Sequence, residues 1–104
     1  MNVWQIITTL PSREAADQIA ASLIEDRLAA CVQIDGPIQS TYRWQEAVAN
    51  EAEWRCTIKT SEQRLDDCIS GLRTRHPYDV PEIIATAAGR VDQAYADWVE
   101  SQVS

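Results

Sequence analysis

A stretch of strict alternation constrains the fold of this chain more than any other feature. Between residues 51 and 59, charged or polar side chains alternate with Ala52, Trp54, Cys56 and Ile58. Successive side chains of a β-strand point to opposite faces of a sheet, so this period of two predicts a strand that is buried on one face only. Strands of this kind are typical of antiparallel sheets.

Three further strands are predicted around it, and they cover residues 3–10, 30–44 and 81–88. The first is rich in β-branched and aromatic residues, and the last is small and apolar enough to be buried on both faces. Because a proline cannot donate a hydrogen bond to a ladder, the second is expected to bend or bulge at Gly36-Pro37. Residues 45–50, which begin with Gln45 and Glu46 and end with Asn50, are expected to form the turn after it.

Apolar residues at helical spacing predict three helices. Ser12 and Ser61 are suited to cap the first two, since a serine oxygen accepts hydrogen bonds from the free N–H groups of a first helical turn. The apolar stripe of the second helix continues to His76, and Pro77 ends that helix. Asp92 opens a closing helix.

The order β-α-β-β-α-β followed by a helix indicates the α+β class. It predicts a ferredoxin-like split βαβ sheet in a single domain over residues 1–104. Two helices cover one face of such a sheet, so the other face is expected to carry apolar side chains such as Trp4 and Trp54. A monomer seldom exposes one large apolar patch. The pattern therefore predicts a homo-oligomer that buries the open face.

Composition argues against several classes of protein. The chain has 9 basic and 16 acidic residues and a net charge of −7, whereas binding to nucleic acid needs a basic face. No apolar run approaches the roughly 18 residues that indicate a membrane span. Cys31, Cys56 and Cys68 form no CxxC pair, which favours reduced thiols and a cytoplasmic location.

The sequence contains no local catalytic or cofactor motif. With one histidine there is no two-histidine zinc motif, and there is no glycine-rich loop for a phosphate or a dinucleotide. Each cysteine lies in an apolar strand or helix pattern, as unreactive buried thiols do. We therefore expect no enzymatic activity and no organic cofactor.

The segment HPYDVPE at residues 76–82 combines two prolines with an imidazole, a phenol and two carboxylates. The prolines restrict the backbone, which suits a segment that presents ligands. The imidazole of His76 suits copper, zinc and nickel, and Asp79 and Glu82 would add oxygen ligands. The alternative interpretation is structural: His76 completes the helix stripe and bonds the last carbonyls, while Tyr78 packs.

Four segments together carry a resemblance to a known family. They are RLAACV at residues 27–32, STYRW at 40–44, IKT at 58–60 and HPYDVPEII at 76–84. On these segments, and along nearly its whole length, the chain resembles the CutA family of divalent-cation tolerance proteins. The resemblance implies a homotrimer in which long hairpin strands extend the sheets of neighbouring subunits. It also implies binding of copper first, zinc second or another divalent metal, without catalytic activity.

Metal-binding members of that family are associated with a cysteine at the end of the first strand and a pair of histidines before PY. Here Thr8 and Arg75 occupy two of these positions, which leaves His76 alone. The candidate metal ligands are His76, Glu82, Asp79 and Cys31. Cys31 also fits the role of a small buried residue on a strand.

The aromatic residues of the predicted hairpin allow two interpretations. Tyr42 and Trp44 are spaced as cross-strand anchors, and with Tyr78 and Lys59 they could also line a crevice between subunits. The first functional hypothesis is a cytoplasmic, trimeric, metal-binding protein of the CutA type. The second is a trimeric signalling or scaffold module of the PII type, which would hold a small metabolite or a partner protein in that crevice.

Overall fold

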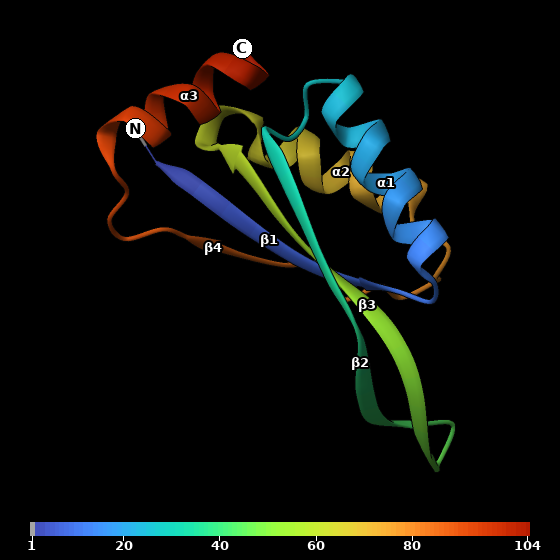
Figure 1. Cartoon of the computed structure of the whole chain (residues 1–104). Helices are drawn as coiled ribbons and strands as arrows, with labels where there is room; N and C mark the ends of the chain where they lie inside the picture. Colours follow the sequence, from blue (N-terminus) through green and yellow to red (C-terminus); the bar gives the residue numbers. More distant parts are fainter. Residues whose placement is uncertain (1) are drawn as a thin grey trace.

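The chain forms a four-stranded antiparallel sheet in the computed structural model, which describes residues 2–104. The central strands are β1 (Val3–Leu10) and β3 (Ala47–Ser61), and the edge strands are β2 (Cys31–Trp44) and β4 (Ile84–Ala87). The predicted order β-α-β-β-α-β followed by a helix is confirmed. Figure 1 shows the sheet with its helices and a long β2–β3 hairpin that projects away from them.

Three α-helices pack against this sheet. They are α1 (Arg13–Glu25), α2 (Leu65–Arg75) and α3 (Gln93–Val103), and a 3-10 turn, η1 (Glu62–Arg64), precedes α2. Two predicted caps are confirmed, because the side chains of Ser12 and Asp92 accept hydrogen bonds from backbone N–H groups in the first turns of α1 and α3. Ser61 was predicted to cap the second helix, but it caps η1, and the N-cap position of α2 is Arg64, whose side chain makes no capping bond. No helix in residues 2–104 has the length and apolar character needed to cross a membrane.

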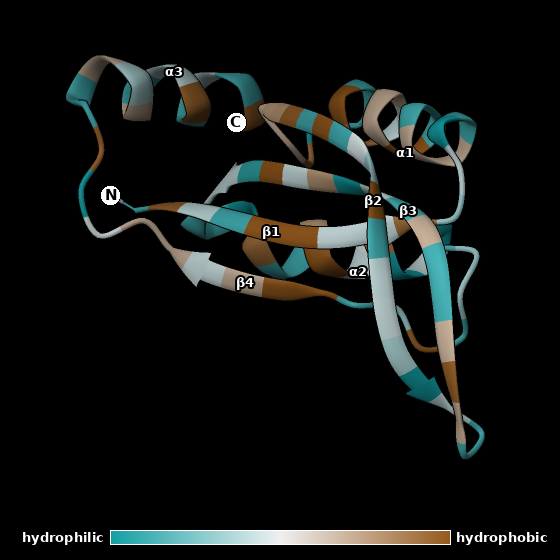
Figure 2. Ribbon diagram, turned by 60° about the horizontal axis from the view of Figure 1, so that its bottom comes forward, coloured by the Kyte–Doolittle hydropathy of each residue, from teal (hydrophilic) through white to brown (hydrophobic). Residues whose placement is uncertain are grey.

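The main core lies between the sheet and the helices α1 and α2. It is built from residues of β1, β3, α1 and α2, and its largest members are Ile6, Leu10, Leu23, Ile58 and Leu72. Figure 2 shows the apolar stretch of β1 at the centre of the sheet. A second, smaller core joins Val3 to Val99 and Val103 of α3. Because Val3 and Ile6 are an odd number of residues apart, α3 covers part of the face opposite α1 and α2.

The expectation that Trp4 and Trp54 lie on the open face is wrong. Trp54 packs against the main core. Trp4 is two residues from Ile6 in a strand without a bulge, so both point to the face that α1 and α2 cover. Alternation groups residues by face, but it does not say which face the helices cover. These two tryptophans therefore do not contribute to the apolar patch on the open face that was the argument for self-association.

Two other expectations are corrected by the bounds of the strands. The turn of the hairpin is Gln45–Glu46 rather than 45–50, and both residues have the positive φ angles that a tight turn requires, 50° and 66°. β4 is shorter than predicted and is not buried on both faces. Ile84 is 54% exposed, because β4 pairs with β1 alone at the edge of the sheet.

The outer part of the hairpin, residues 38–53, forms a two-stranded ribbon that we call the arm. β3 pairs with β1 only from Trp54 to Ser61, so the arm has no third strand. The predicted bulge is confirmed as a register shift between Asp35 and Ile38. At Gly36, φ is +154°, and a Cβ would come within 2.8 Å of the Trp54 ring. Only glycine fits there, and it allows the ribbon to bend away from the body.

Candidate functional site

A groove of about 730 Å³ opens where the arm meets the body. One wall comes from both strands of the arm, and the other is the loop after α2, residues 77–82. The two prolines of this loop restrict its backbone, as its sequence predicts. The volume lies within the range of pockets that hold small molecules.

Three aromatic side chains line the groove. Tyr42 and Trp44 come from the arm, and Tyr78 comes from the loop. Trp44 is 56% exposed and Tyr42 is 40% exposed, so both rings are accessible to a ligand. Desolvation, and then the nearby carboxylate of Glu51, raise the pKa of Tyr42. The structure thus brings together three of the four residues that were predicted to line a crevice.

Four carboxylates line the same groove, and no basic residue does. They are Glu51, Glu53, Asp79 and Glu82. Asp79 and Glu82 were predicted as metal ligands and lie here together. The groove therefore has a negative potential that favours cations.

Glu53 is the residue of the site that sequence reasoning missed. Its side chain is buried, with the residue only 8% exposed, and its Oε2 accepts a hydrogen bond of 2.8 Å from Tyr78 Oη. Burial, followed by this bond to the carboxylate, raises the pKa of Tyr78. Alternation places Glu53 on the face opposite the core, where an exposed side chain is expected. No local signal shows that the Tyr78 loop covers it.

His76 lies beneath the groove wall and not on its surface. Its Nδ1 accepts a hydrogen bond of 3.2 Å from the backbone N–H of Tyr78, so the ring proton is on Nε2. Nε2 then donates to the carbonyl of Thr9 at 3.0 Å and lies 3.0 Å from Thr8 Oγ1. Burial lowers the pKa of His76, which favours this neutral ring. A metal could bind Nδ1 only after the Tyr78 N–H has left it.

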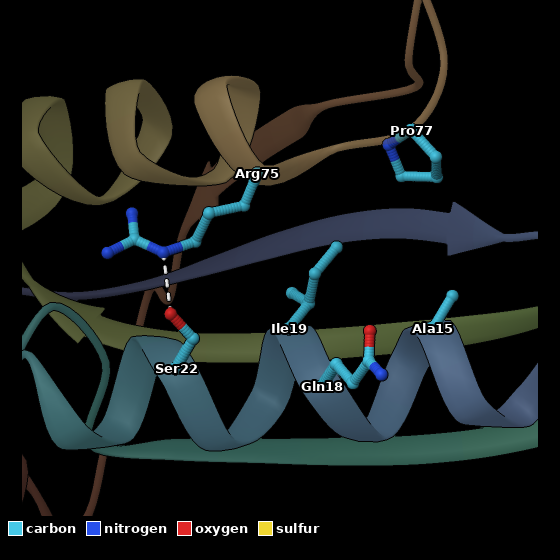
Figure 3. A pocket seen from close by; sticks show the side chains of 6 residues that line it. All are labelled: Ala15, Gln18, Ile19, Ser22, Arg75 and Pro77. Carbon is cyan, nitrogen blue, oxygen red and sulfur yellow. Dashed lines mark hydrogen bonds between the residues drawn. The ribbon is translucent and has the colours of Figure 1, made fainter.

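Thr8 and Arg75, the two positions that the sequence analysis set beside His76, differ in their placement. Thr8 adjoins His76, but Arg75 points away toward α1 (Figure 3). The Arg75 guanidinium donates to Ser22 Oγ at 2.7 Å and to the carbonyl of Gly71 at 2.9 Å, and it forms an ion pair with Asp26. It lines a separate cleft of about 330 Å³ between α1 and the end of α2. Its charge is therefore not directed at the groove.

Cys31 and Lys59 lie away from the groove. They are opposite each other in the β2–β3 ladder. Six residues of β3 separate Lys59 from Glu53, which is about 20 Å along a strand. Lys59 Nζ donates to Gln33 Oε1, and Cys31 adjoins Tyr95 of α3. Within one chain, neither residue adds a contact to the site.

A single chain does not build a closed metal site. Among residues 2–104, no three His, Cys, Asp or Glu side chains come together as a group that could hold a metal ion. Burial raises the pKa of the Cys56 thiol and of the Cys68 thiol to about 11, so neither is a ready thiolate ligand or nucleophile. The groove offers carboxylate oxygens to a metal ion, but the described residues of one chain do not supply a complete set of ligands.

Comparisons with known proteins identify the family. The family model described as CutA1 divalent ion tolerance protein matches residues 4–102. The divalent-cation tolerance protein CutA of Thermus thermophilus is 38% identical over 94 residues, which is 90% of this chain and 91% of that protein. The chloroplastic protein CutA 1 of rice is 38% identical over 92% of this chain, which spans 54% of that protein's length.

Solved structures agree with this assignment. The crystal structure of CutA from Xylella fastidiosa matches with a TM-score of 0.97 and 33% identity over 100% of both chains. The structure of CutA from Synechococcus elongatus matches with a TM-score of 0.95 and 39% identity, covering 99% of this chain and 91% of the other. The fold described above, over nearly the whole chain, is thus the fold of these solved CutA structures. The chain belongs to the CutA1 divalent ion tolerance protein family.

Proposed function

We propose that this protein acts in divalent-cation tolerance as a homotrimer that binds divalent metal, copper first and zinc second, where the copies meet. The observation that carries the proposal is the groove beside the arm, which gathers four carboxylates and no basic side chain. Carboxylate oxygens bind divalent cations, and imidazole adds affinity for copper and zinc.

The described residues of one chain supply only some of the ligands that a metal ion needs. Metal binding would therefore depend on self-association. Asp79 and Glu82 supply accessible oxygens on one loop. His76 would become the nitrogen ligand once the Tyr78 N–H is displaced from it. Cys31 lies too far away to join them within one chain, so it would help only from another copy. A second chain that borders the groove would complete the ligand set.

The arm supports the proposed assembly. Tyr42, Trp44 and Val48 are between 40% and 61% exposed, on a ribbon with no third strand. A two-stranded ribbon is marginally stable alone in water, and its outer edge has free backbone groups that pair with another strand. Three copies that extend one another's sheets would pair this outer edge and place the groove at the seam, with the rings of Tyr42 and Trp44 at its border.

Titration of the full chain with Cu(II) and with Zn(II) tests the proposal. We expect saturable binding that weakens at least about tenfold in Asp79→Asn combined with Glu82→Gln, because both charged oxygens are lost. His76→Ala is expected to weaken copper binding more than zinc binding. Asp66→Asn combined with Asp67→Asn on α2 is the matched control, since it removes the same charge outside the groove.

Equal affinities in wild type, in His76→Ala and in the groove double variant would overturn the proposed site. The proposal involves no enzymatic step. A cytoplasmic location stays a prediction. The comparisons favour the cation-tolerance family over the alternative of a signalling or scaffold module of the PII type.

A further inference from the structure

We propose that the groove binds a small organic cation, an alkyl ammonium or diamine, between its aromatic side chains and the carboxylate of Glu53. This inference goes beyond metal binding, because it needs no metal ion and depends on different residues. It rests on three observations, namely a buried carboxylate without a cation, three aromatic rings around it, and the size of the groove.

The carboxylate of Glu53 lacks a cationic partner in the part of the chain that the structure describes. The residue is 8% exposed, and none of the four ion pairs among residues 2–104 involves it. One oxygen accepts a hydrogen bond from the neutral hydroxyl of Tyr78, and no basic side chain in residues 2–104 pairs with the carboxylate. Buried charges in proteins are normally paired, since desolvation without a partner is costly. The other oxygen has no hydrogen-bond partner among the described residues and therefore offers one to an incoming cation.

The aromatic lining selects the kind of cation. Tyr42, Trp44 and Tyr78 line the same space as Glu53. The face of an aromatic ring attracts an ammonium or guanidinium group, and tryptophan does so most strongly. The side chain of Val80, 77% exposed on the loop, offers apolar surface to an alkyl chain. A bare metal ion uses neither the rings nor this apolar surface.

The size of the groove leads to the same class of ligand. Its volume of about 730 Å³ is within the range for small organic ligands and is far larger than one metal ion needs. The outer carboxylates Glu51, Asp79 and Glu82 are placed to attract a second positive charge on the ligand. A diamine therefore matches the charges of the groove, because one ammonium group can bond Glu53 while the other lies near the outer carboxylates.

The test is calorimetric titration of the full chain with 1,5-diaminopentane at pH 7.5 and low salt, after metals have been removed with a chelator. We expect saturable binding with a dissociation constant below about 1 mM. The uncharged analogue 1,5-pentanediol has the same length and is expected not to bind. A diol that binds as well as the diamine, or a diamine that shows no saturation, would overturn the proposal.

Two variants locate the ligand. Glu53→Gln keeps the shape of the side chain and is expected to weaken diamine binding at least about tenfold, because a charge-assisted hydrogen bond is lost. Glu14→Gln removes the same charge at the exposed start of α1 and is expected to change the affinity less than about twofold. Equal affinities in these two variants would show that Glu53 is not the site.

Trp44→Leu keeps the test decisive if Glu53→Gln does not fold. Trp44 belongs to neither core of the described chain and is 56% exposed there, so its replacement leaves both cores intact. The variant is expected to lose about threefold to fivefold in diamine affinity, and an unchanged affinity would contradict an aromatic cation site.

Metal titrations on the same samples separate the two proposals. Diamine binding without metal binding would overturn only the metal site, and metal binding without diamine binding would overturn only the organic-cation site.

Discussion

The body of the molecule and the arm are stabilised in different ways. In the body, the side chains of Ile6, Leu23 and Leu72 are fully buried, and burial of one such side chain contributes about 1.5–3 kcal/mol. In the arm, Trp44 and Val48 are 56% and 61% exposed, and the ribbon is held by its own ladder. The body therefore carries the stability of the fold, while the arm keeps its apolar surface available for contacts outside the chain.

The largest effect is expected for a truncation in the body. Leu72→Ala removes a fully buried side chain of α2 and should lower the free energy of unfolding by about 3 kcal/mol, measured by urea denaturation. Val48→Ala is the control in the arm and should cost less than about 1 kcal/mol, because the side chain belongs to neither core of its own chain. Equal losses would mean that the arm is packed as firmly as the body.

A smaller effect is expected where the body and the arm meet. Tyr78→Phe removes the hydroxyl that donates to Glu53, so a buried carboxylate loses its hydrogen bond. The free energy of unfolding should fall by about 2 kcal/mol. Tyr95→Phe, on the partly exposed surface of α3, should change it by less than about 0.5 kcal/mol. If Tyr78→Phe were as mild as Tyr95→Phe, the loop would not be fastened to the arm through Glu53.

The pH dependence of stability tests the same junction. Burial lowers the pKa of His76 below its ordinary value near 6.5, although the Thr9 carbonyl and Glu53 act in the opposite direction. The unfolded chain therefore takes up a proton at a higher pH than the folded chain. Stability from the neutral ring is complete above about pH 6.5 and is lost as the pH falls through the lowered folded pKa.

His76→Gln separates this effect from that of the carboxylates. Between pH 8 and pH 5, the urea midpoint of the wild type should fall more steeply than that of the variant. Parallel curves would show that the ring is not held neutral in the folded protein.

The smallest effect is expected within the arm. Thr41 Oγ1 donates to Asn50 Oδ1 across the ribbon at 2.6 Å, and both residues are exposed. Because water can replace this bond, Thr41→Val should lower the free energy of unfolding by about 0.5 kcal/mol or less. A loss of several kcal/mol in the same denaturation assay would place the arm in a buried environment at the protein concentration used.

Sequence patterns predicted the body better than its edges. The first strand was predicted with the bounds that the structure has, Val3–Leu10, and the caps of α1 and α3 were predicted correctly, because these features depend on neighbouring residues. The β4 strand was predicted too long and too buried, since its apolar composition does not reveal that it lies at an edge. The turn was predicted too long, because residues 47–50, of which three are apolar, pair across the ribbon instead of looping out.

The site was predictable only in part. The stiff loop with Asp79 and Glu82 stands out in the sequence, and so do the aromatic residues of the hairpin. Glu53 does not, because its burial depends on contact with Tyr78, which is 25 residues away. Cys31 and Lys59 were grouped with the site by residue type, but their register places them far along the strands. Spacing along one chain cannot show contacts that a fold, or another copy, brings together.

Sedimentation equilibrium of the full chain over a range of concentrations tests most directly whether the arm and groove are surfaces for other copies. One chain has a mass of 11.7 kDa. The proposed trimer predicts a single species of about three times that mass, which persists on dilution to micromolar concentrations. A species of 11.7 kDa that stays soluble and folded at every concentration would contradict it.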